Sequence, residues 1–234
     1  MSGYKGASYV DNAKYHEGQN FFLLIDIKGF YPSITKEKIK KSLILQYEQS
    51  SDVAEFISNL VSVEQTDNKV RALPTGSTIS QNMAFFVNRE MFDELYEVAQ
   101  KNGINMTVYV DDVSFSSKAT IPHNFVNTVL HIVKKYGYQI ATNKMYYGKP
   151  KAKNDNAKSR KRLDITGTQV TKDGAFLTAS RKDRIKLKRE MIKLLIKEEK
   201  TYDKEKLSFI ASIQQAMLVN PKYRRYLQQV QSHI

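Results

Sequence analysis

The sequence contains no cysteine, and this absence excludes disulfide bonds and cysteine-based zinc sites. Its four histidines are too scattered along the chain to form a histidine-rich metal site. No apolar stretch approaches the roughly 18 residues that a membrane-spanning helix needs, and no signal-peptide pattern opens the chain. We therefore expect a cytoplasmic protein with no membrane partner.

Acidic residues are few relative to basic ones. The chain has 37 Lys and Arg against 24 Asp and Glu, which gives a net charge of +13 over 234 residues. Between Lys144 and Lys200, 18 basic and 7 acidic residues contribute +11 of this charge. A basic segment is often only a solvated face, but so uneven a distribution favours contact with a nucleic acid.

Two neighbouring carboxylates, Asp111 and Asp112, interrupt the strand-like run Met106–Phe115. Neighbouring side chains of a strand point to opposite faces of the sheet, so both carboxylates can reach a metal only at a hairpin tip. Mg²⁺ prefers hard oxygen ligands, and two such ions can clamp the oxygens of a phosphoryl transfer. Because Asp is also a common turn residue, the pair alone leaves a solvated turn open.

A third carboxylate, Asp26, lies near the end of the apolar run Phe21–Ile27. Such a continuous run is typical of a strand that is buried on both faces. A charge rarely occupies this position unless it is paired or bound to a metal. Capping of the next turn is the alternative, but the downstream aspartate pair favours metal ligation, with Ile27 as a further candidate ligand.

These carboxylates belong to a series of short motifs in a fixed order. The series consists of Asn12–His16 (NAKYH), Asp26–Ile34 (DIKGFYPSI), Leu73–Ser77 (LPTGS) with Ser80 and Gln81, Tyr109–Asp112 (YVDD) and Ile165–Gly167 (ITG). It resembles the motif series of reverse transcriptases, and its first and last members resemble the NAxxH and VTG segments of bacterial retron reverse transcriptases. The resemblance runs from about Gly3 to the C-terminus.

The resemblance implies an α+β fold, in which a polymerase palm (an antiparallel sheet with packed helices) is followed by a C-terminal helical thumb. We assign residues 1–178 to the palm, with a remnant of the fingers/palm junction at 1–20, and residues 179–234 to the basic thumb. Within the palm, we predict one helix over residues 81–101 and a short strand over residues 138–141. The fingers region that the family normally carries upstream, which holds the triphosphate, is expected to be missing.

The resemblance also implies an RNA-directed DNA polymerase of retron type, located in the bacterial cytoplasm. Such an enzyme copies an associated, structured non-coding RNA into DNA through an RNA–DNA hybrid, and serves in anti-phage defence. Asp26 and Asp111 would bridge two Mg²⁺ ions while Asp112 assists, and deoxynucleoside triphosphates (dNTPs) would be the substrates.

Four residues are predicted to contact the nucleotide. Tyr31 stands at the family's steric-gate position, where a ring would clash with a ribose 2′-hydroxyl; an ordinary core aromatic is the alternative. Thr75 replaces the usual glutamine and is shorter, although the backbone of Gly76 could still approach the nucleotide closely. Lys144 matches a lysine that neutralises the departing pyrophosphate; a solvated surface lysine is the alternative.

Two sets of residues are predicted to contact RNA. By resemblance, the first set is Asn12, His16, Ile165, Thr166 and Gly167, although a lone histidine is more often structural. The second set lies on basic C-terminal helices that could contact phosphates, and consists of Arg181, Lys182, Arg184, Lys188, Arg189, Arg224 and Arg225.

Two functions therefore stay open. The chain is either an active reverse transcriptase or an RNA-binding palm–thumb module that has lost catalysis or depends on a separate fingers polypeptide. An effector protein is a further candidate partner. An RNA-dependent RNA polymerase or a cyclase-type palm is a weaker alternative, because Tyr31 and the flanking retron-like segments argue against both.

Overall fold

The computed structural model describes residues 8–66, 69–150, 163–166, 168–171, 174–197 and 203–231. Its contacts divide the described chain into two compact units. The first unit comprises residues 19–149, and the second combines residues 8–18 with the described residues from 150 onward. This division groups residues 163–177 with the C-terminal helices, whereas the predicted palm–thumb boundary after residue 178 remains a prediction.

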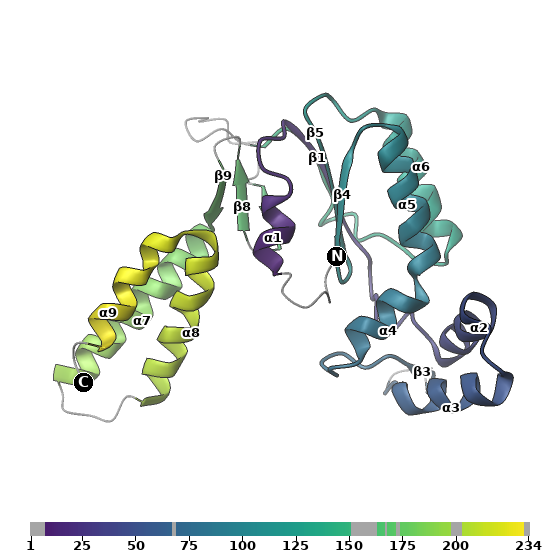
Figure 1. Ribbon diagram of the computed structural model, residues 1–234, viewed down its shortest axis with the longest axis horizontal. Coiled ribbons are helices and arrows are strands. Elements are labelled where there is room, and N and C mark those ends of the chain that lie inside the picture. The colour runs from purple at the N-terminus through teal and green to yellow at the C-terminus, as the bar shows by residue number, and fades with distance from the viewer. Residues whose placement is uncertain are drawn as a thin grey trace. The chain divides into compact units, whose positions relative to one another are not determined.

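The first unit is built on a four-stranded antiparallel sheet in the order β4-β5-β1-β6 (Figure 1). Its strands are β1 (Phe21–Asp26), β4 (Asn105–Tyr109), β5 (Asp112–Ser117) and β6 (Tyr146–Gly148). The strand β1 is an interior strand, and its neighbouring residues Phe22 and Leu23 are both fully buried. Because neighbouring side chains point to opposite faces, β1 is covered on both faces, as its apolar run predicts.

Two helices, α5 (Arg89–Lys101) and α6 (His123–Lys135), cover one face of this sheet (Figure 1). Their apolar side chains recur at helical spacing, so one stripe of each helix faces the sheet. Leu95 of α5 and Val129 of α6 are fully buried in the same core as Phe115 of β5. This core fixes the strand that carries one of the candidate aspartates.

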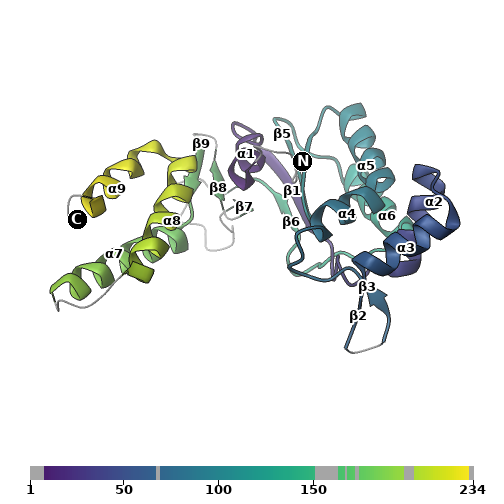
Figure 2. The same ribbon diagram turned by 60° about the horizontal axis from the view of Figure 1, so that its bottom comes forward.

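A connecting region joins β1 to α5 (Figure 2). It consists of α2 (Lys36–Tyr47), α3 (Ser51–Val61), the short hairpin of β2 (Val63–Glu64) and β3 (Arg71–Ala72), and α4 (Ser80–Val87). The amide nitrogen of Leu73 donates a hydrogen bond of 3.1 Å to the carbonyl of Ile34. This bond holds the Leu73–Ser77 loop beside the segment that follows Asp26.

Two predicted elements are wrong. Residues 81–101 fall into two helices because Asn88 is buried between them, where its amide nitrogen donates to the Ala84 carbonyl and its oxygen accepts from the Tyr138 hydroxyl. Residues 138–141 do not form a strand. In that segment Ile140 makes only an isolated antiparallel bridge with Ile27.

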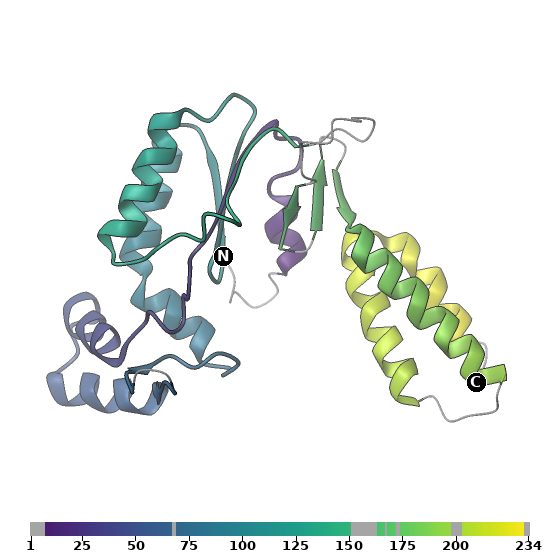
Figure 3. The ribbon, with the colours of Figure 1, turned by 180° about the vertical axis from the view of Figure 1, so that it is seen from behind.

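The second unit joins a three-stranded antiparallel sheet to a group of helices (Figure 3). Its elements are α1 (Tyr9–Lys14), β7 (Asp164–Ile165), β8 (Thr168–Thr171), β9 (Gly174–Leu177), α7 (Ala179–Lys197), α8 (Asp203–Val219), the 3₁₀ turn η1 (Pro221–Tyr223) and α9 (Arg224–Gln231). Val10 of α1 shares a core with Leu177 of β9 and Phe209 of α8. The predicted α+β class is confirmed in both units.

None of the helices described here is long and apolar enough to cross a membrane.

Candidate active site

The two adjacent aspartates lie at the tip of the β4–β5 hairpin, where Tyr109 pairs with Asp112 and only Val110 and Asp111 form the turn. Val110 has a φ of 59°, and Asp111 is not among the residues with positive φ. A positive φ at the first position of a two-residue hairpin turn is a conformation that glycine normally adopts. A β-branched valine in this conformation costs about 1–3 kcal/mol, and such strain clusters at functional sites.

The register of the sheet brings Asp26 to this hairpin tip. Asp26 pairs with Asp112 across β1 and β5, and the Ile27 amide donates a hydrogen bond of 3.0 Å to the Asp111 carbonyl. The three carboxylate-bearing residues are therefore neighbours at one end of the sheet, although 84 or more residues separate the first from the other two. The predicted hairpin placement of the pair is confirmed.

The surroundings of Asp111 favour its protonated form. Burial is the main cause that raises the pKa of Asp111, and the negative charge of Asp26 raises it further. Lys144 acts in the opposite direction on the pKa of Asp111. The site therefore concentrates negative charge in a partly buried place, which is the environment that binds a cation.

Lys144 lies against the first aspartate. Its Nζ donates a hydrogen bond of 2.6 Å to Oδ1 of Asp26. This hydrogen bond and the charge of Asp26 raise the pKa of Lys144, and Asp111 and Asp112 add to the effect. The structure thus brings together Asp26, Asp111, Asp112 and Lys144.

The donor chemistry of this site fits Mg²⁺, because carboxylate oxygens are hard ligands. The side chain of Ile27 is a hydrocarbon, so only its backbone carbonyl could serve as a ligand. Within the described ranges, however, no three His, Cys, Asp or Glu side chains converge closely enough to hold a metal ion. Asp26 instead has the ammonium of Lys144 as its cation.

The residues predicted to contact the nucleotide do not all lie in the same surroundings. Burial raises the pKa of Tyr31, and the charges of Asp111 and Tyr109, which belong to the hairpin, raise it further. The same ring packs against the core beside Phe30, at 5.9 Å between centroids. Thr75 and Gly76 lie in an exposed loop, where Gly76 has a φ of 88° that favours glycine.

The NAxxH-like and VTG-like segments lie together in the second unit. The Thr166 hydroxyl donates a hydrogen bond of 2.8 Å to the carbonyl of Tyr9, in the helix that carries Asn12. His16 is fully buried, and this burial lowers its pKa to about 4. Ile165 is also buried, both polar atoms of the Asn12 side chain are buried, and Gly167 lies outside the described residues. RNA contact by these residues remains a prediction.

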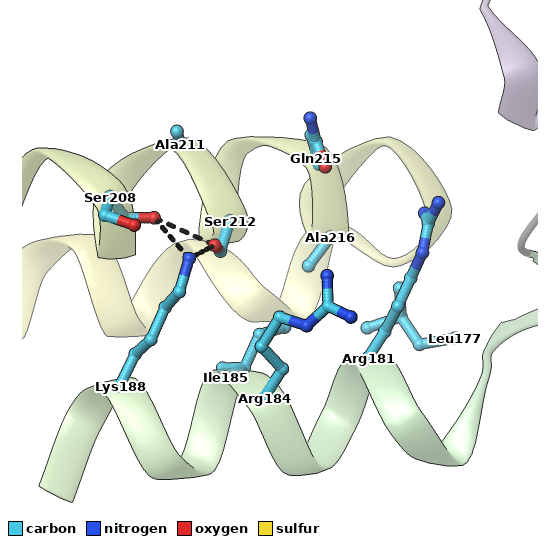
Figure 4. A pocket seen from close by; sticks show the side chains of 10 residues that line it. All are labelled: Leu177, Arg181, Arg184, Ile185, Lys188, Ser208, Ala211, Ser212, Gln215 and Ala216. Carbon is cyan, nitrogen blue, oxygen red and sulfur yellow. Dashed lines mark hydrogen bonds between the residues drawn. The ribbon is translucent and has the colours of Figure 1, made fainter.

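Three of the predicted RNA-binding cations line a groove of about 300 Å³ between α7 and α8 (Figure 4). Lys188 donates hydrogen bonds to the Ser212 hydroxyl at 2.7 Å and to the Ser208 carbonyl at 3.1 Å. Arg181 donates to the Tyr9 hydroxyl at 2.6 Å, and its guanidinium lies 4.5 Å from the centre of that ring. These two cations therefore connect elements of the unit, whereas Arg184 is exposed in the groove.

The remaining predicted cations differ in their surroundings. The guanidinium groups of Arg189 and Arg225 lie 5.2 and 5.1 Å from the ring centre of Tyr226. Lys182 and Arg224 are exposed. Sequence patterns did not indicate the role of Tyr9 as the partner of Arg181, because 172 residues separate the two.

Comparison with known proteins identifies the class. Residues 2–170 match the family described as "Reverse transcriptase (RNA-dependent DNA polymerase)", and the chain belongs to this family. Among curated proteins, it is 28% identical over 132 residues to the retron Mx162 reverse transcriptase of Myxococcus xanthus, a match that covers 50% of this chain and 27% of the relative. It is 26% identical over 148 residues to the retron Ec83 reverse transcriptase of Escherichia coli, covering 59% and 46%.

The predicted resemblance to retron reverse transcriptases is confirmed by these relatives and by a third, the retron Se72 reverse transcriptase of Salmonella heidelberg (strain 579083-10). This third relative is 28% identical over 128 residues, which cover 55% of this chain and 32% of the relative. The chain thus spans less than half the length of each curated relative.

Solved structures agree on the fold. A foamy viral protease–reverse transcriptase in complex with double-stranded DNA aligns with a TM-score of 0.59 at 18% identity, covering 99% of this chain and 34% of that one. A foamy viral protease–reverse transcriptase in complex with an RNA/DNA hybrid aligns with a TM-score of 0.53 at 19% identity, covering 90% and 23%. The predicted polymerase palm with a helical C-terminal part is confirmed as a fold.

Proposed function

We propose that this chain is the catalytic part of a retron-type, RNA-directed DNA polymerase that uses two Mg²⁺ ions. The observation that carries the proposal is the meeting of Asp26, Asp111 and Asp112 at one end of the sheet. A family match over residues 2–170 supports a catalytic role for this arrangement.

The residues of the first unit have separate roles in the proposed reaction. Asp26 and Asp111 hold the metal ions through carboxylate oxygens, and Asp112 orients the site. When bound there, the ions would lower the pKa of the primer's terminal hydroxyl and would stabilise the charge of the departing pyrophosphate. Tyr31 limits the space next to the sugar, which favours deoxynucleotides, and Lys144 neutralises the pyrophosphate.

Two further parts of the chain contact the substrates. Because Thr75 is short and exposed, the nucleotide contact in its loop falls to the flexible backbone of Gly76. The exposed cations of the second unit, such as Arg184 and Lys182, hold the template through phosphates. The template is a structured non-coding RNA, and the product is an RNA–DNA hybrid.

The biological setting that we propose follows from the retron relatives. The protein works in the bacterial cytoplasm, in anti-phage defence, with an effector protein as a candidate partner. A separate polypeptide could also complete the nucleotide-binding site.

Primer extension tests the proposal directly. The parent chain, an RNA template with an annealed primer, Mg²⁺ and dNTPs should give DNA, and Asp111→Asn should lower the rate by at least about 10²–10³-fold, because it removes a charged group that stabilises the transition state. RNA affinity should stay nearly unchanged in this variant. Asp93→Asn is the matched control, since Asp93 is an exposed residue of α5 that pairs with Arg89.

The outcomes separate the two functions that the sequence left open. Normal synthesis by Asp111→Asn would overturn the catalytic assignment. RNA binding without synthesis by the parent chain, both alone and with added protein partners, would favour the alternative, an RNA-binding palm–thumb module.

A further inference from the structure

The contact between Lys144 and Asp26 is built into the backbone of the first unit. The Ala141 amide donates a hydrogen bond of 2.9 Å to the carbonyl of Asp26 itself. The amides of Lys144 and Met145 then donate to the Ala141 carbonyl at 2.9 and 3.2 Å, which closes a turn. The residue that carries the ammonium is therefore anchored directly on the end of the strand that carries the carboxylate.

The two side chains differ in their freedom to move. The Asp26 side chain is 15% exposed and lies at the end of an interior strand, whereas the Lys144 side chain is 62% exposed. Lysine has a flexible four-carbon stem, so its ammonium can leave while its backbone stays in place. Asp26 can thus exchange this cation for another one without a change in the sheet.

The ammonium and a metal ion would compete for the same oxygen. Nζ lies 2.6 Å from Oδ1 of Asp26, whereas Mg²⁺ requires oxygen ligands at about 2.0–2.1 Å in near-ideal octahedral geometry. Two cations at such distances from one carboxylate oxygen also repel each other. The charges of Asp111 and Asp112 also favour the ammonium form of Lys144.

We propose that Lys144 is an internal counter-ion of Asp26 that competes with the divalent cation, and that this competition sets the metal affinity of the site. The inference rests on the proposed metal-binding role of Asp26. Lys144 is thereby a positioning residue that acts through Asp26, in addition to any contact with pyrophosphate. It neutralises the charge of Asp26 until a metal ion displaces it.

Metal binding, measured apart from catalysis, tests this competition. Mn²⁺ accepts the same oxygen ligands as Mg²⁺, and its binding to the full chain can be followed by electron paramagnetic resonance without nucleotide. Lys144→Met, which removes the charge and keeps most of the stem, should bind Mn²⁺ about fivefold more tightly than the parent, as expected for loss of one partly exposed ion pair. Lys144→Arg should restore an affinity close to that of the parent.

Two controls make the result specific. Lys118→Met removes the same charge just beyond the opposite end of β5 and should leave Mn²⁺ affinity unchanged. Asp26→Asn should abolish Mn²⁺ binding at this site both in the parent and in the Lys144→Met variant. Circular dichroism of each variant confirms that the fold is retained.

The possible failures are distinguishable. If Lys144→Met binds Mn²⁺ with the same or lower affinity than the parent, while Asp26→Asn still abolishes binding, the competition is overturned and the metal-binding role survives. If no variant binds Mn²⁺ in a manner that depends on Asp26, both the metal-binding role and the competition are overturned. A function of Lys144 confined to pyrophosphate predicts no change in Mn²⁺ affinity.

Discussion

The two units of this protein use their charged residues in opposite ways. In the first unit, backbone pairing of β1 with β5 brings Asp26 beside Asp112, and burial together with the charge of Asp26 raises the pKa of Asp111. In the second unit, Arg181 and Lys188 donate hydrogen bonds to neighbouring elements. The acidic residues bring like charges close together at one end of the sheet. Arg181 and Lys188, in contrast, stabilise the second unit through hydrogen bonds.

This difference predicts different consequences of mutation. A substitution at the hairpin tip removes chemistry and leaves the packing intact, because the register of the sheet does not depend on the carboxylates. A substitution among the basic residues of the second unit has two separable effects, on stability and on nucleic-acid binding.

Tyr31 should control sugar selection without contributing greatly to the metal site. Tyr31→Ala should raise the incorporation of ribonucleotides relative to deoxynucleotides by roughly 100-fold, the discrimination that a tight pocket gives against one added hydroxyl. Steady-state single-nucleotide extension measures this ratio. Tyr31→Phe keeps the ring and should behave like the parent, and unchanged selection in Tyr31→Ala would leave Tyr31 as a core aromatic only.

The second unit should lose stability in mild acid through His16. Burial lowers the pKa of His16 to about 4 in the folded protein, below the ordinary value of about 6.5, so the unfolded chain binds a proton more readily. Stability is therefore lost as the pH falls below about 6.5, by about 2 kcal/mol between pH 7 and pH 5. Urea unfolding followed by circular dichroism at both pH values measures it.

Two variants isolate the contribution of His16 to this pH dependence. The loss of unfolding free energy between pH 7 and pH 5 should be smaller in His16→Leu than in the parent. It should be unchanged in His131→Gln, which replaces an exposed histidine of the first unit. An equal loss in the parent and in His16→Leu would assign the acid sensitivity to other groups.

Arg181 and Arg184 should separate stability from RNA binding within one groove. Arg181→Met should destabilise the protein by about 1–2 kcal/mol, because it removes a charged hydrogen bond and a cation–π contact with Tyr9. Arg184→Met should leave the urea midpoint nearly unchanged and reduce the salt dependence of RNA binding by about one unit of log–log slope. If both variants change only stability, this groove does not contact RNA.

The sequence predicted β1 and the β4–β5 hairpin better than it predicted the segments around them. The apolar run of β1 and the hairpin between residues 106 and 116 were recognisable because their patterns are local. The break at Asn88 was not, because it depends on the hydroxyl of Tyr138, which is 50 residues away. The predicted strand at 138–141 failed for a related reason, since that segment makes a single bridge with β1.

The sequence by itself determined which residues are chemically equipped to act, since motif order and residue type are local properties of the chain. Only the tertiary structure decided which of these side chains are available. His16 is buried, Arg181 donates a hydrogen bond to Tyr9, and the ammonium of Lys144 is paired with Asp26. The physical reason is that burial and pairing depend on partners far apart in the chain, such as Tyr9 and Arg181 at 172 positions, and only folding brings such partners together.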